Sequence, residues 1–150
     1  MAETGFIIKV LFENADNRGI GEIFSTGRNW PAILDECHRE GVAPLFYHRI
    51  VKRGWEADLP AEVLDQFRTL FRQTIRKNSE AVKCLGTIGR SFDAEGIPWI
   101  VLKGIALAET VYPHFALRPA SDIDILVPRP DFMKADAALT SMGYRSVDSP

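Results

Sequence analysis

Cysteine is scarce in this sequence of 150 residues. The two cysteines, Cys37 and Cys84, lie far apart, and neither belongs to a paired spacing of the kind that binds zinc. A disulfide framework and a zinc site are therefore not expected. We interpret each cysteine as a small apolar residue buried in the protein interior.

Long apolar runs and an excess of basic residues are also missing. The apolar run at residues 6–12 is interrupted by Lys9 and is far too short to span a bilayer, and the N-terminus lacks the basic start of a signal peptide. Lys and Arg number 18 against 20 Asp and Glu, which gives a formal net charge of -2. This balance removes any bulk electrostatic attraction to nucleic acid or to an anionic membrane. We expect a cytoplasmic protein with no membrane partner.

Helical signals fill the first two thirds of the chain, whose 46% hydrophobic and 25% charged residues are typical of a globular protein. Asn29 is well placed to cap a helix over residues 31–41. A second helix is expected over residues 44–52, because Pro44 suits its first turn and Gly54 suits its end.

Residues 60–95 form the longest predicted helix. Their apolar side chains recur at spacings of three, four and seven, or at multiples that fit one helical face. These side chains are Leu64, Phe67, Phe71, Val82, Leu85 and Phe92. Gly96 is expected to end the helix, and the pattern leaves open a bend at Gly86 or Gly89.

The pattern changes after residue 96. Residues 99–102 form a continuous apolar run of strand length, which is typical of a strand covered on both faces. The elements expected after it are a short helix at 105–111, a strand at 123–127, a helix capped by Asp131 that runs through Met142, and a strand at 144–147. The sequence therefore predicts an α+β fold, with a mainly helical region at 1–96 and the first part of an α/β core at 97–150.

Two carboxylates head the second apolar strand. Asp122 and Asp124 are two positions apart, so strand geometry would send both side chains to one face. Like charges side by side repel one another unless a cation neutralises them, and carboxylate oxygens suit Mg²⁺. The pattern predicts a site for Mg²⁺, with Mn²⁺ as the alternative ion. In the competing interpretation, Asp122 is a turn residue beside Ser121 and Asp124 faces solvent.

Lys103 and Gly104 stand where the first strand gives way to a helix. Free backbone N–H groups and the helix dipole favour an anion there, and glycine lets the backbone approach a phosphate closely. The Lys103 ammonium adds a charge suited to a polyphosphate. Taken alone, the pair is equally compatible with a tight turn and a solvated lysine. Together, Lys103-Gly104 and the two acids supply the two parts that nucleotidyl transfer requires, namely a phosphate-binding turn and a metal site.

At these residues the chain resembles the nucleotidyltransferases of the DNA polymerase beta superfamily, and more closely its uncharacterised bacterial branch, labelled nucleotidyltransferase family protein. The resemblance covers about residues 30–147. Its carriers are Val101-Leu102-Lys103-Gly104, Leu107, Tyr112, Arg118, Ser121-Asp122-Ile123-Asp124-Ile125-Leu126-Val127 and Gly143-Tyr144, with Trp30 and Gly41-Val42-Ala43-Pro44-Leu45 in the helical part. It implies N-terminal helices packed on a small mixed β-sheet of the polymerase beta type, incomplete in this chain.

The resemblance also implies roles for individual residues. Phosphate binding would fall to Gly104, with Lys103, Arg118 and Ser121 beside it, and Mg²⁺ binding to the catalytic pair Asp122 and Asp124. At one position the chain departs from the superfamily: Ile105 follows the glycine where a small or hydroxyl residue is usual. The superfamily also has a third carboxylate on a later strand. Asp148 is a candidate for it, but relatives continue further, so we expect this chain to be a fragment.

Several residues near this site keep two interpretations. Arg118 either contacts a phosphate oxygen or forms an ion pair with Asp122 or Asp124. Tyr112 and His114 either stack on a base or belong to the core. A basic stripe on the long helix either contacts a polynucleotide or is a solvated face. Its members are Arg68, Arg72, Arg76, Lys83 and Arg90.

The sequence thus predicts an Mg²⁺-dependent nucleotidyltransferase. It would bind a nucleoside triphosphate such as ATP, transfer the nucleoside monophosphate to a hydroxyl-type acceptor and release pyrophosphate. The acceptor is a small molecule, a protein side chain or an RNA end. The alternative is a catalytically inactive domain of the same fold that binds a nucleotide or a partner. A third interpretation is an RNA-binding helical protein that uses the basic stripe.

Overall fold

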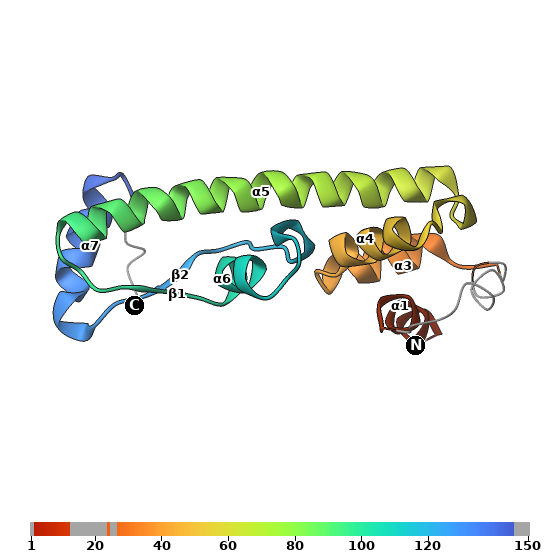
Figure 1. Cartoon of the computed structure of the whole chain (residues 1–150), viewed down its shortest axis with the longest axis horizontal. Helices are drawn as coiled ribbons and strands as arrows, with labels where there is room; N and C mark the ends of the chain where they lie inside the picture. Colours follow the sequence, from red (N-terminus) through yellow and green to blue (C-terminus); the bar gives the residue numbers. More distant parts are fainter. Residues whose placement is uncertain (1, 13–23, 25–26, 146–150) are drawn as a thin grey trace.

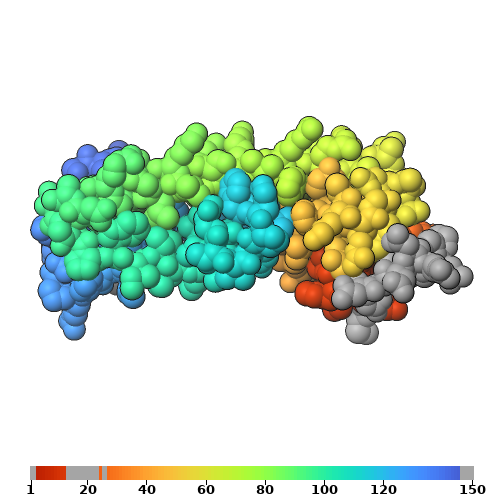
Figure 2. Space-filling view, in the orientation of Figure 1, coloured from red at the N-terminus to blue at the C-terminus, as the bar shows by residue number. Residues whose placement is uncertain are grey.

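The computed structural model describes residues 2–12, 24 and 27–145 of the chain. Its longest element is a single helix, α5 (Ala61–Ala94), which runs along the whole molecule (Figure 1). Most other elements lie along one side of α5, so the molecule is elongated (Figure 2). Helices pack beside the first half of α5, and a small sheet with two short helices packs beside its second half.

Within the described residues, the N-terminal group contains the helices α1 (Ala2–Phe12), α3 (Trp30–Arg39) and α4 (Ala43–Arg53). The helices predicted over residues 31–41 and 44–52 are confirmed as α3 and α4. Asn29 caps α3, because its side-chain oxygen accepts a hydrogen bond from the backbone N–H of Ala32 at 3.2 Å. Gly54 ends α4 in the left-handed conformation, with a φ of 71°.

The first core lies between α1, α3, α4 and the first half of α5. Phe46 of α4 and Phe67 of α5 stack with their ring centroids 4.9 Å apart. Helix α1, which the sequence patterns do not predict, adds Phe6 to this core. Cys37 is fully buried here, as predicted. Burial raises the pKa of its thiol to about 12, with a smaller contribution from the neighbouring Glu36 carboxylate.

Helix α5 confirms the helix predicted over residues 60–95. It is continuous through Gly86 and Gly89, and it ends just before Gly96, whose φ is 66°. The buried or half-buried stripe of its second half consists of Asn78, Ala81, Leu85, Ile88 and Phe92. The predicted apolar face is wrong at Val82, which is 39% exposed because it lies one position off this stripe. Within the described ranges, no helix combines the length and apolar character that a membrane span requires.

The remaining elements of the described chain are two strands, two helices and short 3₁₀ turns. These elements are β1 (Ile100–Leu102), α6 (Lys103–Thr110), β2 (Asp124–Leu126), α7 (Phe132–Ser141), η1 (Glu56–Asp58), η2 (Phe115–Leu117) and η3 (Arg129–Asp131). Strands β1 and β2 pair antiparallel, with Ile100 opposite Leu126 and Leu102 opposite Asp124. An α+β fold whose sheet is incomplete in the described part of the chain is confirmed.

The prediction that β1 is covered on both faces is wrong. Val101 and Ile125 pack toward α5, but Ile100 is 61% exposed and its partner Leu126 is 54% exposed. An apolar run indicates a strand, but it does not specify which of its faces other elements cover. The small sheet therefore has one packed face and one open face among the described residues.

Other predictions for this region have mixed outcomes. Tyr144 and Arg145 do not lie in a strand, and the other half of the strand predicted over 144–147, like Asp148, lies outside the described residues. Cys84 is only half-buried, and its Sγ lies 2.7 Å from the Tyr144 hydroxyl, so it is not simply an apolar core residue. The domain division between residues 1–96 and 97–150 stays a prediction.

Candidate functional site

The turn between β1 and α6 is built on an unusual backbone. Lys103 has a φ of 49°, and it is the one non-glycine residue with a positive φ in the described part of the chain. This conformation turns the chain abruptly from strand β1 into α6. No side chain caps the N-terminus of α6. The first N–H groups of α6 are therefore left without the intrahelical partners that later turns have.

Gly104 brings this turn against the segment that leads into β2. A Cβ atom added at Gly104 would lie 3.4 Å from the Cβ of Ala120 and 3.7 Å from the carbonyl oxygen of Asp122. The space between Gly104 and Ala120 is therefore only about large enough for a methyl group, and the helix that Gly104 opens packs on Ala120 through Ile105 and Ala108. The sequence separates Gly104 from Ala120 by 16 residues. The predicted phosphate turn and the predicted acids are neighbours in space.

The two predicted metal ligands lie at the edge of this contact. Asp124 begins β2, and its Oδ2 lies 3.5 Å from the Lys103 Nζ. The side chains of Asp124 and Lys103 are 39% and 75% exposed, so water screens this ion pair and it contributes little to stability. Asp122 precedes the strand and is exposed, and its Oδ1 accepts a hydrogen bond from the Ser121 hydroxyl at 3.3 Å.

The two carboxylates are the donors that could hold a metal here. Among the described residues, no group of three or more His, Cys, Asp or Glu side chains is arranged to bind an ion. Mg²⁺ is usually held by one or two carboxylates, with water and substrate phosphates as its other ligands. The donor set of Asp122 and Asp124 therefore fits an ion bound together with a nucleotide better than an ion held by the protein alone.

Arg118 makes no ion pair with Asp122 or Asp124 in the described structure. Its Nε is buried and has no hydrogen-bond acceptor among the described residues. A buried N–H donor without an acceptor is energetically costly, so the Nε of this half-buried side chain has the capacity to donate to an anion. Contact with a phosphate remains a prediction.

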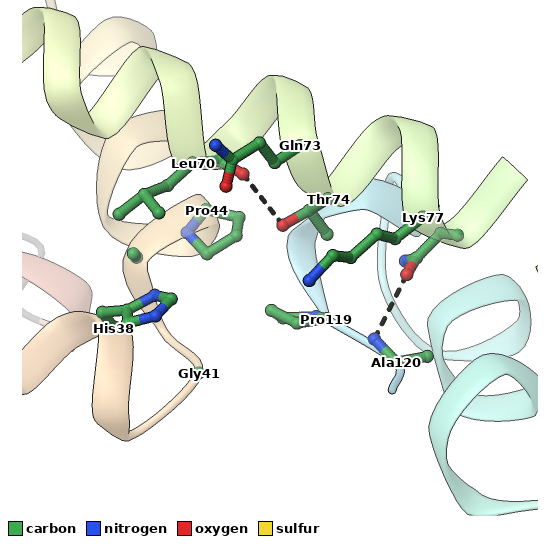
Figure 3. Close-up of a pocket in the computed structure, with 11 residues that line it drawn as sticks. His38, Gly41, Pro44, Leu70, Gln73, Thr74, Lys77, Pro119 and Ala120 are labelled. Carbon is green, nitrogen blue, oxygen red and sulfur yellow. Dashed lines mark hydrogen bonds between the residues drawn. The ribbon is translucent and has the colours of Figure 1, made fainter. Parts of the chain in front are cut away.

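The sequence patterns did not predict a role for Asn78. This residue holds the loop at residues 115–121, which precedes the two acids. Asn78 is fully buried on α5, and its Nδ2 donates hydrogen bonds to the carbonyl oxygens of Phe115 at 2.7 Å and Arg118 at 2.9 Å. Its Oδ1 accepts a hydrogen bond from the backbone N–H of Ala120 at 3.2 Å (Figure 3). The available signal was a polar residue within the apolar stripe of the long helix.

Two hollows flank this loop. Figure 3 shows the smaller one, where Lys77 of α5 and Pro119 of the loop face the α3–α4 corner near His38. The larger hollow, of roughly 730 Å³, runs along α5 past Ser121 and Asp122 toward α7. Asp122 therefore borders the larger hollow, whereas Asp124 is not among the residues that line it. The smaller hollow lies behind the loop that precedes Asp122.

The remaining candidates have local roles in the described structure. His114 caps η2, because its Nδ1 accepts a hydrogen bond from the Ala116 N–H at 3.1 Å, and its ring stacks on Phe115 at 5.1 Å. Tyr112 is half-buried. In the basic stripe, Arg68 pairs with Asp65 at 3.0 Å and Arg76 with Glu80 at 3.9 Å. Acidic residues of the same helix therefore neutralise part of the positive charge of the basic stripe.

The structure thus brings a turn at Lys103 and Gly104, between a strand and a helix, beside a segment that carries Asp122 and Asp124 into an antiparallel strand. Residues 26–150 match the family model described as uncharacterised nucleotidyltransferase, so the chain belongs to this family. The match confirms the resemblance to nucleotidyltransferases that the sequence motifs predict. No curated protein and no solved structure matches the chain.

Proposed function

We propose that this chain carries the nucleotide-binding part of an Mg²⁺-dependent nucleotidyltransferase, which transfers a nucleoside monophosphate from a nucleoside triphosphate to a hydroxyl-type acceptor. The observation that carries the proposal is the close approach of the turn at Gly104 to Ala120 and Asp122, where an added Cβ would lie 3.4 Å from the Ala120 Cβ and 3.7 Å from the Asp122 carbonyl oxygen. Because of this close approach, a triphosphate bound at the turn would lie next to both carboxylates. Family membership supports the general class of reaction.

The turn would hold the triphosphate through its backbone and one cation. Gly104 presents no side chain that would keep a phosphate away, and the free N–H groups of α6 favour an anion. The Lys103 ammonium lies beside Asp124, at a place where it can bridge a carboxylate and a phosphate. The buried Nε of Arg118 and the Ser121 hydroxyl would add donors from the neighbouring loop.

Asp122 and Asp124 would hold Mg²⁺, or Mn²⁺ in its place, together with phosphate oxygens and water. The ion would neutralise the charge that develops on the triphosphate during transfer. The acceptor is a small molecule, a protein side chain or an RNA end. A cytoplasmic location is part of the proposal, because the cytoplasm supplies nucleoside triphosphates.

The second candidate is a catalytically inactive domain of the same fold that binds a nucleotide or a partner. One observation favours it: Asp122 and Asp124 have no third acidic neighbour among the described residues. Two-metal chemistry requires further ligands to activate the attacking hydroxyl. Binding of a nucleotide without transfer to any acceptor would support this candidate.

Calorimetric titration with Mg²⁺ and each of ATP, GTP, CTP and UTP tests the proposal. We expect at least one nucleotide to bind, and we expect the double variant Asp122→Asn with Asp124→Asn to bind it roughly tenfold or more weakly. The control is Asp131→Asn with Asp136→Asn, which changes the net charge equally on η3 and α7. Equal binding by the wild type and the Asp122 and Asp124 double variant would refute the site.

Gly104→Ala tests the phosphate role separately from the metal role. The added Cβ would make ordinary contact with Ala120 at 3.4 Å, so we expect the melting temperature to change little. Nucleotide binding should nevertheless weaken, because the methyl group would fill the space between the turn and the segment at Ala120 and Asp122, where the proposed phosphate meets the acids. Unchanged binding by this variant would mean that the phosphate lies elsewhere.

A further inference from the structure

We infer that Asn78 is the positioning residue that sets the distance between the phosphate turn and the metal-binding acids. The inference rests on the proposed function and extends it to a residue on the long helix, remote in sequence from both motifs. It assigns Asn78 no contact with nucleotide or metal. Its role would be to hold the backbone that carries those contacts.

All three hydrogen bonds of the Asn78 side chain go to one loop. Two run from Nδ2 to the carbonyls of Phe115 and Arg118, and one runs from the Ala120 N–H to Oδ1. The bonds span 37, 40 and 42 residues of sequence. One rigid helix thus fixes the whole loop that ends at Ser121 and Asp122.

The same loop residue that Asn78 holds also touches the phosphate turn. The Ala120 N–H donates to Asn78 Oδ1, and the Ala120 side chain packs with Ile105 and Ala108 of α6, close enough to the turn that a Cβ added at Gly104 would lie 3.4 Å away. Asn78, Ala120 and Gly104 therefore form a continuous line of contacts from α5 to the turn. A shift of Ala120 would change the separation between Gly104 and Asp122, and misplacement of reacting groups by about 1 Å can cost roughly 100-fold in rate.

An asparagine is required by the donor and acceptor pattern. The site needs two donors facing carbonyl oxygens and one acceptor facing an N–H group, and a single amide supplies both. An aspartate of the same shape keeps the acceptor but turns an oxygen toward the two carbonyls. An alanine leaves the two carbonyls and the N–H group without their partners.

The test compares the full chain with Asn78→Ala, with the isosteric Asn78→Asp and with a matched control, Thr74→Ala. Thr74 lies one turn earlier on α5 and is 7% exposed, and its hydroxyl donates to Leu70 of its own helix. Thr74→Ala therefore deletes a buried hydroxyl whose hydrogen bond stays within α5 and does not go to the loop. Two quantities are measured for each variant, namely hydrogen exchange of the backbone amides in residues 115–124 and the Kd for each of the four nucleoside triphosphates with Mg²⁺.

We expect both Asn78 variants to exchange faster in residues 115–124 and to bind Mg²⁺–nucleotide roughly 10- to 100-fold more weakly, as is typical when an outer partner of a metal ligand is lost. Thr74→Ala should match the wild type within about twofold in both quantities. If Asn78→Ala does not fold, Asn78→Asp, which keeps the volume, decides the question.

Two contrary outcomes are distinguishable. If the wild type binds a nucleotide and both folded Asn78 variants bind it equally well despite a loosened loop, Asn78 only stabilises the loop and the inference is overturned. The proposed function would survive that result. If the wild type binds none of the four nucleotides with Mg²⁺, the proposed function itself is wrong and the inference falls with it.

Discussion

Lys103 combines a strained backbone with an exposed charge. A left-handed conformation costs a residue with a Cβ about 1–2 kcal/mol, and glycine adopts it freely. Lys103 nevertheless occupies this position, with its Nζ beside Asp124. Strain of this kind is found where the side chain or the turn has a function. The lysine is thus better explained by its charge than by its contribution to stability.

The strain gives a prediction at Lys103. Lys103→Gly and Lys103→Ala both remove the charge, but only glycine relieves the left-handed backbone. We expect the free energy of unfolding of Lys103→Gly, measured by urea denaturation, to be about 1 kcal/mol higher than that of Lys103→Ala. Both variants should bind Mg²⁺–nucleotide more weakly than the wild type. Equal stability of the two variants would show that the turn is not strained.

Some of the candidate functional residues were predictable from the sequence, and others were not. Lys103, Gly104, Asp122 and Asp124 were predicted because their chemistry and spacing follow a short local pattern. Asn78 was not, because its partners are backbone carbonyls and an amide some 40 residues away. Any residue offers such groups, so no sequence pattern marks them.

Among the elements, helix α5 fixes the position of the sheet through Trp99. The Trp99 ring packs directly on the α5 backbone at Gly89, where a Cβ would lie 2.6 Å from Trp99 Cζ2. The ring is held in place, because its Nε1 donates a hydrogen bond to Asp93 Oδ1 at 3.0 Å and it packs edge-on against Phe92. Trp99 leads directly into β1, so this contact places the strand that ends at Lys103.

Gly89 and Gly86 therefore respond differently to the same substitution. At Gly86 a Cβ meets only Arg90 Nη1 at 3.7 Å, so Gly86→Ala should stabilise the helix by up to about 1 kcal/mol. Gly89→Ala should lower the free energy of unfolding, because overpacking costs about 1–3 kcal/mol and exceeds the helix gain. Thermal melts of the two variants measure the contrast. Similar gains in both would mean that Trp99 does not pack on Gly89.

Element boundaries were predictable where a residue type enforces them. Asn29 caps a helix, and Gly54 and Gly96 end helices with φ values of 71° and 66°. The face of β1 that packs against other elements was not predictable. Each strand has only three residues, and the apolar run of β1 is compatible with packing on either face. Helix α1 was missed because its apolar residues do not follow a clear helical period.

For the whole molecule, α5 acts as the common support. Its first half packs on α3 and α4, and its second half packs on the sheet, α6 and α7. Through Asn78 it also holds the loop before the acids. The order of the elements along the chain was predictable, but this shared support depends on packing between distant segments. The site is consequently a property of the folded chain and not of either motif alone.

In the proposed function, Lys103-Gly104 and Asp122-Ile123-Asp124 form one site for a metal-bound nucleotide. The most direct measurement is the NMR line broadening of backbone amides when Mn²⁺ and a nucleoside triphosphate are added to the ¹⁵N-labelled chain, since this broadening falls steeply with distance from the ion. We predict that the amides of residues 103–104 and 122–124 broaden together while those of α3 and α4 keep their intensity. Broadening centred elsewhere, with both motifs unaffected, would contradict the account.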